Sequence, residues 1–400
     1  MANTILTPVA VTNEALRVLH QKLNFVGSIN RSYDSSFAKS GAKIGDSLKI
    51  RLPNQYTVST GRNLDVQETS ETSVTLQVAT QKHVDMNFTS DELTLSMDDF
   101  SDRVIKPAMS VLAANIEYDA MAMYKDVYQS VWNSGSALTL AHVLGGRKIL
   151  QDSLTPLDTR TANLDGQQMV DLVTDSKALF NDKSEISRQY LEGYVGRALG
   201  FDFMENSLWP AHTRGAMNAS STVDTRTSNI PTDGTATSSL TMASGTGTML
   251  KGDVFTIGNC FKVHPETKAS TGILQQFTVT ADNAGGAVAV AFSPAIVLGG
   301  AKQNCVIPTT SATAALLPLG TASGADNTGL LYHKDAFTFA TADLVMPSGV
   351  DFSARKVLDG ISMRVVRQYD INSDKFPCRI DVLYGYKTVR PQLAVRLHNN

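Results

Sequence analysis

Residues 105–128 read IKPAMSVLAANIEYDAMAMYKDVY and contain the longest helical pattern in the chain. Apolar side chains recur after three or four residues, or after two full turns, as in a helix with one buried face. Pro107 is compatible with a helix only in the first turn, so it indicates where the helix begins. The pattern predicts a spine helix of about six turns within residues 101–131, well above the usual length of about three turns. The pattern is carried by Ile105, Met109, Leu112, Ile116, Met123 and Val127.

Two alternating patterns precede this helix and flank a long polar stretch. Residues 48–52 and 74–78 place apolar side chains at every second position, the period of a half-buried strand, and residues 84–88 continue it. The stretch 60–72 between them is too hydrophilic for a core and too long for a tight turn. The sequence therefore predicts a hairpin arm, about residues 53–81, that projects from the body.

The first 40 residues predict an N-terminal arm with a short amphipathic helix between residues 12 and 26. Leu16, Leu19 and Leu23 recur there at helical spacing. If these leucines pack inward, the exposed face carries the polar residues Glu14, Arg17 and Gln21.

The composition changes after the spine helix. Residues 136–215 mix helical and strand patterns, whereas residues 216–330 carry few charges and are rich in Gly, Ser, Thr and Ala. Short β-type runs between turn residues in the second region predict a small antiparallel sandwich or barrel. Mixed patterning resumes in residues 331–400, with a hairpin around residues 372–374 and a last strand at 390–397. We therefore expect an all-β domain inserted into a mixed domain.

Length, charge and cysteine usage limit the class of protein. The 400 residues have a formal net charge of -3 and only 18% charged residues, so no strong field favours nucleic acid or an anionic membrane. The sequence has no apolar stretch of about 18 residues and no secretory signal pattern, so we expect a cytoplasmic protein without a membrane span. Cys260, Cys305 and Cys378 lack the spacing of a metal or disulfide motif and are expected to be free, buried thiols.

The common enzyme signatures are absent from the sequence. Phosphate loop, dinucleotide fingerprint, nucleophile elbow and zinc-protease motif all fail to match, and the seven histidines are scattered singly. Asp370, Asn372, Asp374 and Asp381 occupy calcium-loop positions, but Lys375 stands where that loop needs glycine, so a hairpin turn is favoured. The acidic residues before the spine helix are similarly interpreted as complements of the helix dipole. The sequence thus predicts no enzyme, no cofactor and no metal.

The order of the predicted elements resembles a known family. An arm helix, a projecting hairpin, a spine helix, a mixed domain with a β insertion and a returning sheet are similar to the HK97-type coat-protein fold of tailed bacteriophages. Local sequences narrow this resemblance to the P22-like coat family. They are Gly45–Leu48, Phe88–Leu93, Gly196–Phe203, Pro210–Thr213, Leu250–Phe255, His333–Phe337 and Arg379–Gly385.

The resemblance implies an α+β fold whose parts map onto the chain. The extended hairpin corresponds to the E-loop of that fold, and the insertion to an all-β, barrel-like domain. The expected divisions are the N-terminal arm at 1–40, the start of the P-domain with E-loop and spine helix at 41–135, the first part of the A-domain at 136–215, the inserted domain at 216–330, and the A-domain return with C-terminal P-domain strands at 331–400.

The resemblance also implies a major capsid protein that self-assembles into hexamers and pentamers of an icosahedral virion shell. A scaffolding protein would guide assembly in the host bacterial cytoplasm, and the shell would expand while double-stranded DNA is packaged, without sequence specificity, through a portal protein. A decoration protein is a further candidate partner. Two alternatives stay open: the shell of an encapsulin-like compartment, and a cytoplasmic enzyme with an unrecognised site.

Candidate contacts between subunits lie at the hairpin tip. Residues 53–81 contain no lysine, so the tip offers no amine for an isopeptide bond and non-covalent locking is expected. The tip charges Arg62, Asp65, Glu68 and Glu71 are the candidates for pairing with basic residues of an adjacent subunit. In this family the N-terminal arm lies towards the scaffold and later the DNA. The resemblance therefore makes Glu14, Arg17 and Gln21 candidate scaffold-facing or lumen-facing residues.

Overall fold

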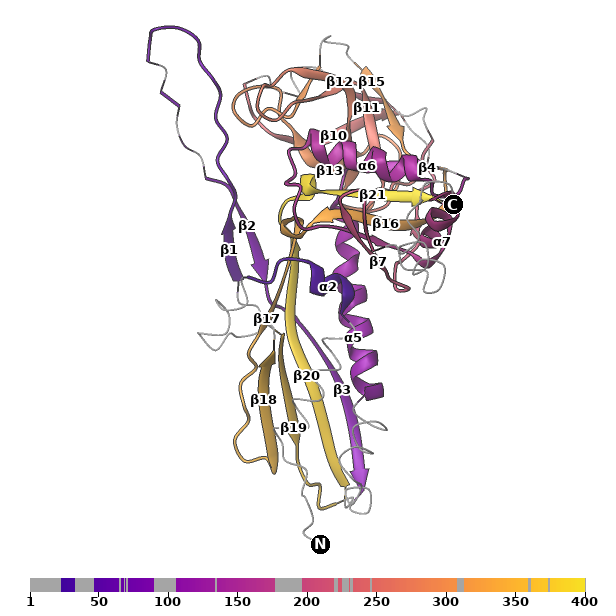
Figure 1. Ribbon diagram of the computed structural model, residues 1–400. Coiled ribbons are helices and arrows are strands. Elements are labelled where there is room, and N and C mark those ends of the chain that lie inside the picture. Colours follow the sequence, from indigo (N-terminus) through magenta and orange to yellow (C-terminus); the bar gives the residue numbers. More distant parts are fainter. Residues whose placement is uncertain are drawn as a thin grey trace. The chain divides into compact units, whose positions relative to one another are not determined.

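The computed structural model describes most of the chain, and the described residues form two compact units (Figure 1). The first unit combines residues 1–50, 73–121 and 337–389, and the second combines 51–72, 122–336 and 390–400. The described residues are 23–32, 47–64, 66–67, 69, 71–89, 106–133, 135–176, 196–218, 222–224, 230, 233–244, 247–307, 313–358, 361–372 and 375–399.

The first unit is built on a five-stranded antiparallel sheet (Figure 1). Its longest strand, β20 (Lys375–Thr388), pairs along one side with β3 (Thr80–Thr89). Along its other side β20 pairs with β17 (Phe337–Ala342) and β19 (Ile361–Arg367), and β18 (Phe352–Leu358) lies beyond β19. The predicted strand at 84–88 and the predicted hairpin around 372–374 are thereby confirmed.

The base of the long hairpin is a two-stranded ribbon. Strands β1 (Ser47–Arg51) and β2 (Ser73–Gln77) pair, and both show the predicted alternation of exposed and buried positions. Ile50 and Leu76 pack into a small core with Leu383 of β20. The apolar alternation in the sequence therefore identified both strands.

The spine helix is shorter than predicted. Helix α5 is described over Lys106–Met121, so Pro107 lies near the start of its described part. A 3₁₀ helix, Ala122–Asp126, follows, and strand β4 (Ser130–Asn133) begins soon afterwards, so the predicted continuation of the helix to Tyr128 is wrong. The carbonyl oxygens of Lys125 and Val127 accept hydrogen bonds from the Arg396 side chain, which replace the bonds of a further helical turn.

A buried carboxylate fixes the N-terminal segment on α5. Glu117 is fully buried on the apolar face of the helix, and its two oxygens accept hydrogen bonds from the backbone N–H groups of Phe25 and Val26. These donors belong to the first turn of α2 (Asn24–Ser28), where a helix lacks acceptors of its own. The arm helix was predicted between residues 12 and 26, and its residues up to 22 lie outside the described part of the chain.

The second unit contains a mixed sheet in the order β4-β21-β16-β5-β7-β6, with β8 paired to β16. Helices α6 (Leu140–Asp152) and α7 (Gly166–Ser176) pack their apolar faces against it, which confirms helical patterns within residues 140–176; the helical pattern at 185–194 lies outside the described residues. No helix among the described residues has the length and apolar character needed to cross a bilayer. The remaining strands are β5 (Arg160–Leu164), β6 (Arg197–Ala198), β7 (Phe201–Glu205), β8 (His212–Thr213), β16 (Ala325–His333) and β21 (Ala394–Asn399).

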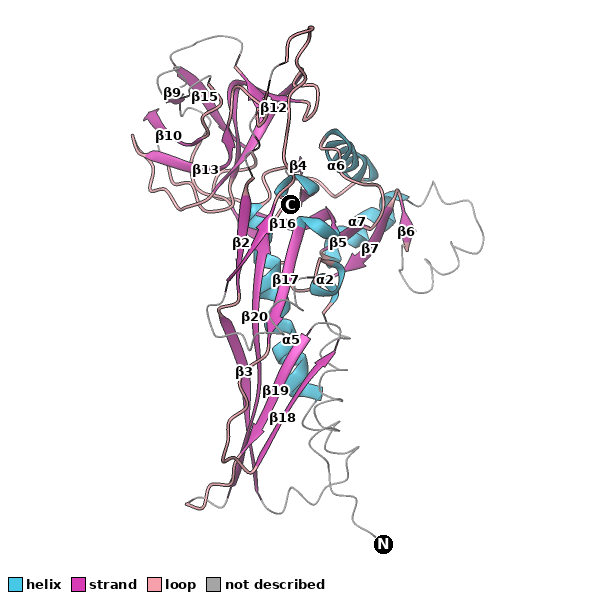
Figure 2. Ribbon diagram, turned by 90° about the vertical axis from the view of Figure 1, so that its left-hand side faces the viewer, coloured by secondary structure: helices cyan, strands magenta, loops and turns pink. Residues whose placement is uncertain are grey.

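The second unit also contains a closed antiparallel barrel (Figure 2). Six strands follow one another in the order β12-β13-β10-β9-β15-β11, and β11 pairs back with β12 to close the ring. Phe255, Phe277 and Phe292 meet at its centre with ring centroids 5.2–5.9 Å apart. The barrel strands, with β14 paired to β11, are β9 (Thr222–Asp224), β10 (Thr237–Ser244), β11 (Val254–Val263), β12 (Ser270–Val279), β13 (Ala289–Ile296), β14 (Cys305–Val306) and β15 (Thr313–Pro318).

Details of the barrel differ from expectation. Residues 254–263 form the single strand β11, within which Asn259 adopts a positive φ of 61° and the ladder shifts its register. The expected insert of residues 216–330 also includes residues 325–330 of β16, which belongs to the mixed sheet. The three cysteines are free and buried, as expected.

Candidate functional site

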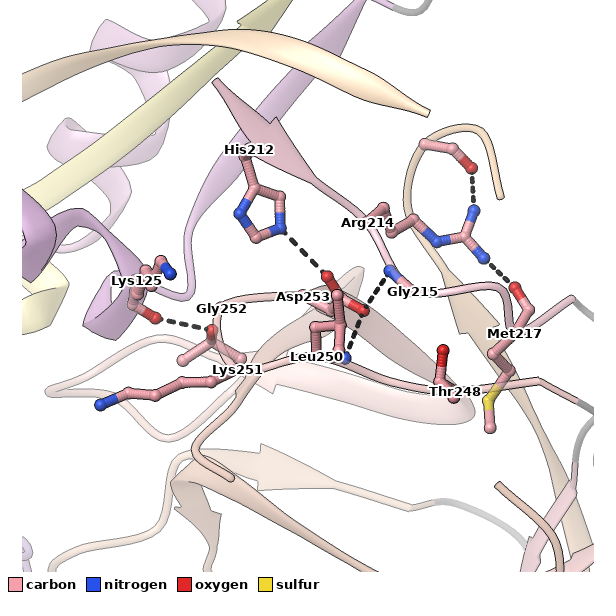
Figure 3. Close-up of polar contacts among 12 residues, drawn as sticks. Lys125, His212, Arg214, Gly215, Met217, Thr248, Leu250, Lys251, Gly252 and Asp253 are labelled. Atoms are coloured by element: carbon pink, nitrogen blue, oxygen red, sulfur yellow. Dashed lines mark hydrogen bonds and ion pairs between the residues drawn. The ribbon is translucent and has the colours of Figure 1, made fainter. Parts of the chain in front are cut away.

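The chain enters and leaves the barrel through a tightly bonded junction. The incoming connection is residues 214–217 and the outgoing one is residues 319–324, and both lie next to the loop 247–253. Figure 3 shows the polar side chains that gather there. We call this set of contacts the barrel junction.

Asp253 organises one side of the barrel junction (Figure 3). Its Oδ2 accepts hydrogen bonds from the backbone N–H groups of Gly215 at 3.0 Å and Leu250 at 2.9 Å. Its Oδ1 lies 3.0 Å from Nε2 of His212 in strand β8. One buried carboxylate therefore joins the incoming connection, the loop and the mixed sheet.

Arg214 joins the two connections to each other (Figure 3). Its guanidinium donates hydrogen bonds to the carbonyl oxygens of Gly320 and Met217. Gly215 is required beside it because a Cβ at this position would lie 2.2 Å from the carbonyl oxygen of Thr248. The two connections are thus held together near Gly215, where the backbone of the loop 247–253 comes closest to them.

Arg396 of strand β21 holds the other side of the barrel junction. It is fully buried, and its guanidinium donates hydrogen bonds to the carbonyl oxygens of Val127 and Gly252 at 2.6 Å each. Further bonds reach the carbonyl oxygen of Lys125 and Oγ1 of Thr278. Burial lowers the pKa of Arg396 from its usual value to about 10. The carbonyl dipoles therefore stabilise the guanidinium charge of Arg396, which burial has removed from water.

A row of partly unsatisfied polar groups crosses the sheet face beside Arg396. His398 stacks on Trp132 with ring centroids 4.3 Å apart, and its neighbour in the ladder is Thr328. In the described structure both ring nitrogens of His398, Oγ1 of Thr328 and both carboxyl oxygens of Asp326 have no hydrogen-bond partner. Burial, with the nearby Arg396 charge, lowers the pKa of His398 well below its usual value, and burial raises that of Asp326.

The chain Tyr124, His212 and Asp253 resembles the proton relay of a general-base catalyst. Tyr124 Oη lies 3.1 Å from Nδ1 of His212, whose Nε2 faces Asp253. All three side chains are almost completely buried, so no substrate reaches the imidazole. The described residues also contain no cluster of three metal-ligating side chains. The geometry of these three residues therefore indicates a structural role.

The residues predicted to contact another subunit are not part of the barrel junction where the structure describes them. Arg62 and Glu71 are exposed in the loop between β1 and β2, and Glu71 forms an exposed ion pair with Arg51 at 3.3 Å. Asp65 and Glu68 lie outside the described residues. The same holds for the predicted scaffold-facing residues Glu14, Arg17 and Gln21.

The calcium-loop positions have structural roles where they are described. Asp370 and Lys375 pair across a hairpin turn, as expected. Asp381 is fully buried and accepts two hydrogen bonds from Arg364, at 3.0 and 2.5 Å. Asp374 lies outside the described residues.

Sequence reasoning missed the residues of the barrel junction. Arg396 and His398 interrupt an otherwise apolar strand, and Asp253 stands between Gly252 and the apolar start of β11. Isolated polar residues in such runs are a signal of buried hydrogen bonding. The resemblance includes two segments of the junction, Pro210–Thr213 with His212 and Leu250–Phe255 with Asp253, but it assigns no role to either residue.

The chain is similar to known phage proteins. Residues 200–398 match the family model described as "P22 coat protein - gene protein 5", whereas no curated protein matches. A chain of Mycobacterium phage Che8 is 14% identical at a TM-score of 0.49, and the match covers 93% of this chain and 90% of that one. A chain titled "Asymmetric unit of bacteriophage PhiM1 mature capsid" is 11% identical at 0.45, covering 88% and 82%. One from the head of Helicobacter pylori bacteriophage KHP40 is 10% identical at 0.42, covering 91% and 85%.

The family match covers most of the residues that build the site, but not those in residues 124–132. Residues 200–398 include the barrel, both of its connections and the strands β16 and β21, which carry Asp326, Arg396 and His398. Residues 200–398 of the chain belong to the P22-like family of phage coat proteins.

Proposed function

We propose that this coat protein forms the icosahedral shell of a tailed phage as a scaffold-assisted procapsid that expands when double-stranded DNA is packaged through a portal. The match of residues 200–398 to the P22 coat protein model carries this proposal. The model that matches the barrel is that of a phage coat protein, so we infer a virion shell and not an encapsulin-like compartment.

The exposed surface of the hairpin loop supports self-assembly. Val58, Leu64 and Val66 are 94%, 90% and 76% exposed, which leaves three large apolar side chains in one loop facing water. We interpret these exposed apolar side chains as a surface that contacts another molecule. In a shell, that molecule is the neighbouring subunit.

The test is co-expression of the full chain with the scaffolding protein encoded beside it. We expect closed particles of uniform diameter in electron micrographs and elution at megadalton mass. Expression without the scaffolding protein is the control and should give aberrant or open shells. A protein that stays a monomer or dimer at high concentration with the scaffolding protein present would contradict the proposal.

A further inference from the structure

Two of the three buried thiols lie together inside the barrel. Cys260 of β11 and Cys305 of β14 both belong to the barrel core, whereas Cys378 lies in β20 of the first unit. The thiol of Cys260 forms a side-chain hydrogen bond with the thiol of Cys305, so the two sulfur atoms are in contact. Both side chains are fully buried. We call these two residues the thiol pair.

The backbone of β11 explains why the two thiols meet. Ile257 belongs to the barrel core, and the period of two would place residue 259 there next. Asn259 is instead exposed with a positive φ, and this extra residue moves Cys260 to the core side of the strand. In the ladder Lys262 stands opposite Cys305, so Cys260 is a diagonal neighbour of Cys305 on the adjacent strand. The thiol pair is therefore built by an irregularity of the strand and by the ladder, and no local sequence motif marks it.

Two thiols in contact are the reactants for a disulfide bond. The thiolate of one residue attacks a small-molecule disulfide and releases half of it, and the second protein thiol then attacks the mixed disulfide and releases the other half. The protein gives up two electrons, the small disulfide is reduced to two thiols, and the protons of the two protein thiols end on these products. The second step joins sulfur atoms that are already neighbours.

We propose that Cys260 and Cys305 form a disulfide bond within one chain when the protein meets a small-molecule disulfide as oxidant. The bond ties β14, which pairs only with β11 among the described strands, to the rest of the barrel. It also encloses β12 and β13 in a covalent loop, which restricts the unfolded chain. The site lies within a single chain, so the inference is independent of the proposed function.

The surroundings of the thiol pair make its oxidation slow. The hydrogen bond with Cys305, together with burial, raises the pKa of the Cys260 thiol far above its usual value, so thiolate is scarce at neutral pH. An oxidant reaches the sulfur atoms only when this edge of the barrel opens, and β14 has just two residues to hold it closed. Oxidation should therefore accelerate at higher pH and in low urea that leaves the barrel folded.

The first test is oxidation of the wild-type full chain with oxidised glutathione at mildly alkaline pH. Free thiols are blocked with N-ethylmaleimide during denaturation, and the chain is digested with trypsin without reductant. We expect the tryptic peptides 252–262 and 303–334 to be joined through Cys260 and Cys305, with Cys378 as the blocked thiol. Three blocked thiols after prolonged oxidation, with and without low urea, would overturn the inference. So would Cys260 joined to glutathione or to Cys378.

The second test measures what the bond does to stability. At the urea midpoint of the reduced chain, the ratio of folded to unfolded protein, followed by tryptophan fluorescence, should rise at least about tenfold on oxidation. Cys378→Ser keeps the thiol pair and is the matched control, so it should show the same gain. Cys305→Ala should show no gain.

The outcomes of the two tests are distinct. A linked chain that is no more stable than the reduced chain would overturn the role assigned to the bond. An equal gain in Cys305→Ala would show that glutathione acts elsewhere, which also overturns the inference. The first test uses no variant, so it decides whether the bond forms even if Cys305→Ala does not fold.

Discussion

Replacing Arg396 by methionine tests whether the barrel junction holds the second unit together. Methionine has a similar length and keeps apolar packing, but it donates no hydrogen bond. The carbonyl oxygens of Val127 and Gly252 would then lose the donor that the described structure gives them. The oxygen of Lys125 would keep its bond from Oγ1 of Thr278 at 3.0 Å.

The structure sets the size of the expected effect. A buried acceptor left without a partner costs about 1–3 kcal/mol, so two such oxygens predict a loss of about 2–6 kcal/mol in the free energy of unfolding. The assay is urea unfolding followed by tryptophan fluorescence. Both tryptophans belong to the second unit, where Trp132 stacks on His398 and Nε1 of Trp209 donates to Oδ1 of Asn163.

An exposed arginine of the same unit provides the control. Arg197 lies 3.7 Å from Asp202 in an exposed ion pair, so Arg197→Met should cost at most about 1 kcal/mol. If Arg396→Met also stays within about 1 kcal/mol of wild type, the junction contributes little and the reasoning is refuted. An equal loss in both variants would show that the assay measures a general effect of removing arginine.

Three further predictions concern pH, the N-terminal segment and the shell. Because burial and the Arg396 charge hold the pKa of His398 below that of an unfolded histidine, stability should be constant above about pH 6.5 and fall below it by up to about 1.4 kcal/mol per pH unit; acid titration followed by fluorescence should show a smaller slope for His398→Phe. Glu117→Gln replaces one of two buried acceptors by a donor, so amide exchange at Phe25 and Val26 should accelerate, whereas exchange at slow rates as in wild type would contradict the role of Glu117. Mature particles should give one band of 43.0 kDa on denaturing gels, and a ladder of linked subunits would disprove non-covalent locking.

The fold was largely predictable because its strongest signals are local. The period of two in residues 74–78 and 84–88 marks strands that bury one face, and the change of composition after residue 215 marks the barrel. The end of α5 was not predictable in this way. Apolar spacing continues to Val127, but hydrogen bonds from Arg396, almost 270 residues later in the chain, decide which backbone carbonyls are free to continue the helix.

The barrel junction escaped prediction for a related reason. In β21, Val395 and Leu397 pack towards α6, whereas Arg396 bonds the barrel residues Gly252 and Thr278. An alternation of apolar and polar residues is ordinarily interpreted as one buried and one solvated face. Such an alternation shows only that the two faces of the strand have different surroundings. Here the polar face is covered by an inserted domain whose own carbonyl and hydroxyl groups complete its hydrogen bonds, so every described residue of β21 is buried. In this chain, polar residues of the sheet therefore hold the barrel in place through hydrogen bonds. At these positions a larger apolar side chain should detach the barrel and leave the sheet folded.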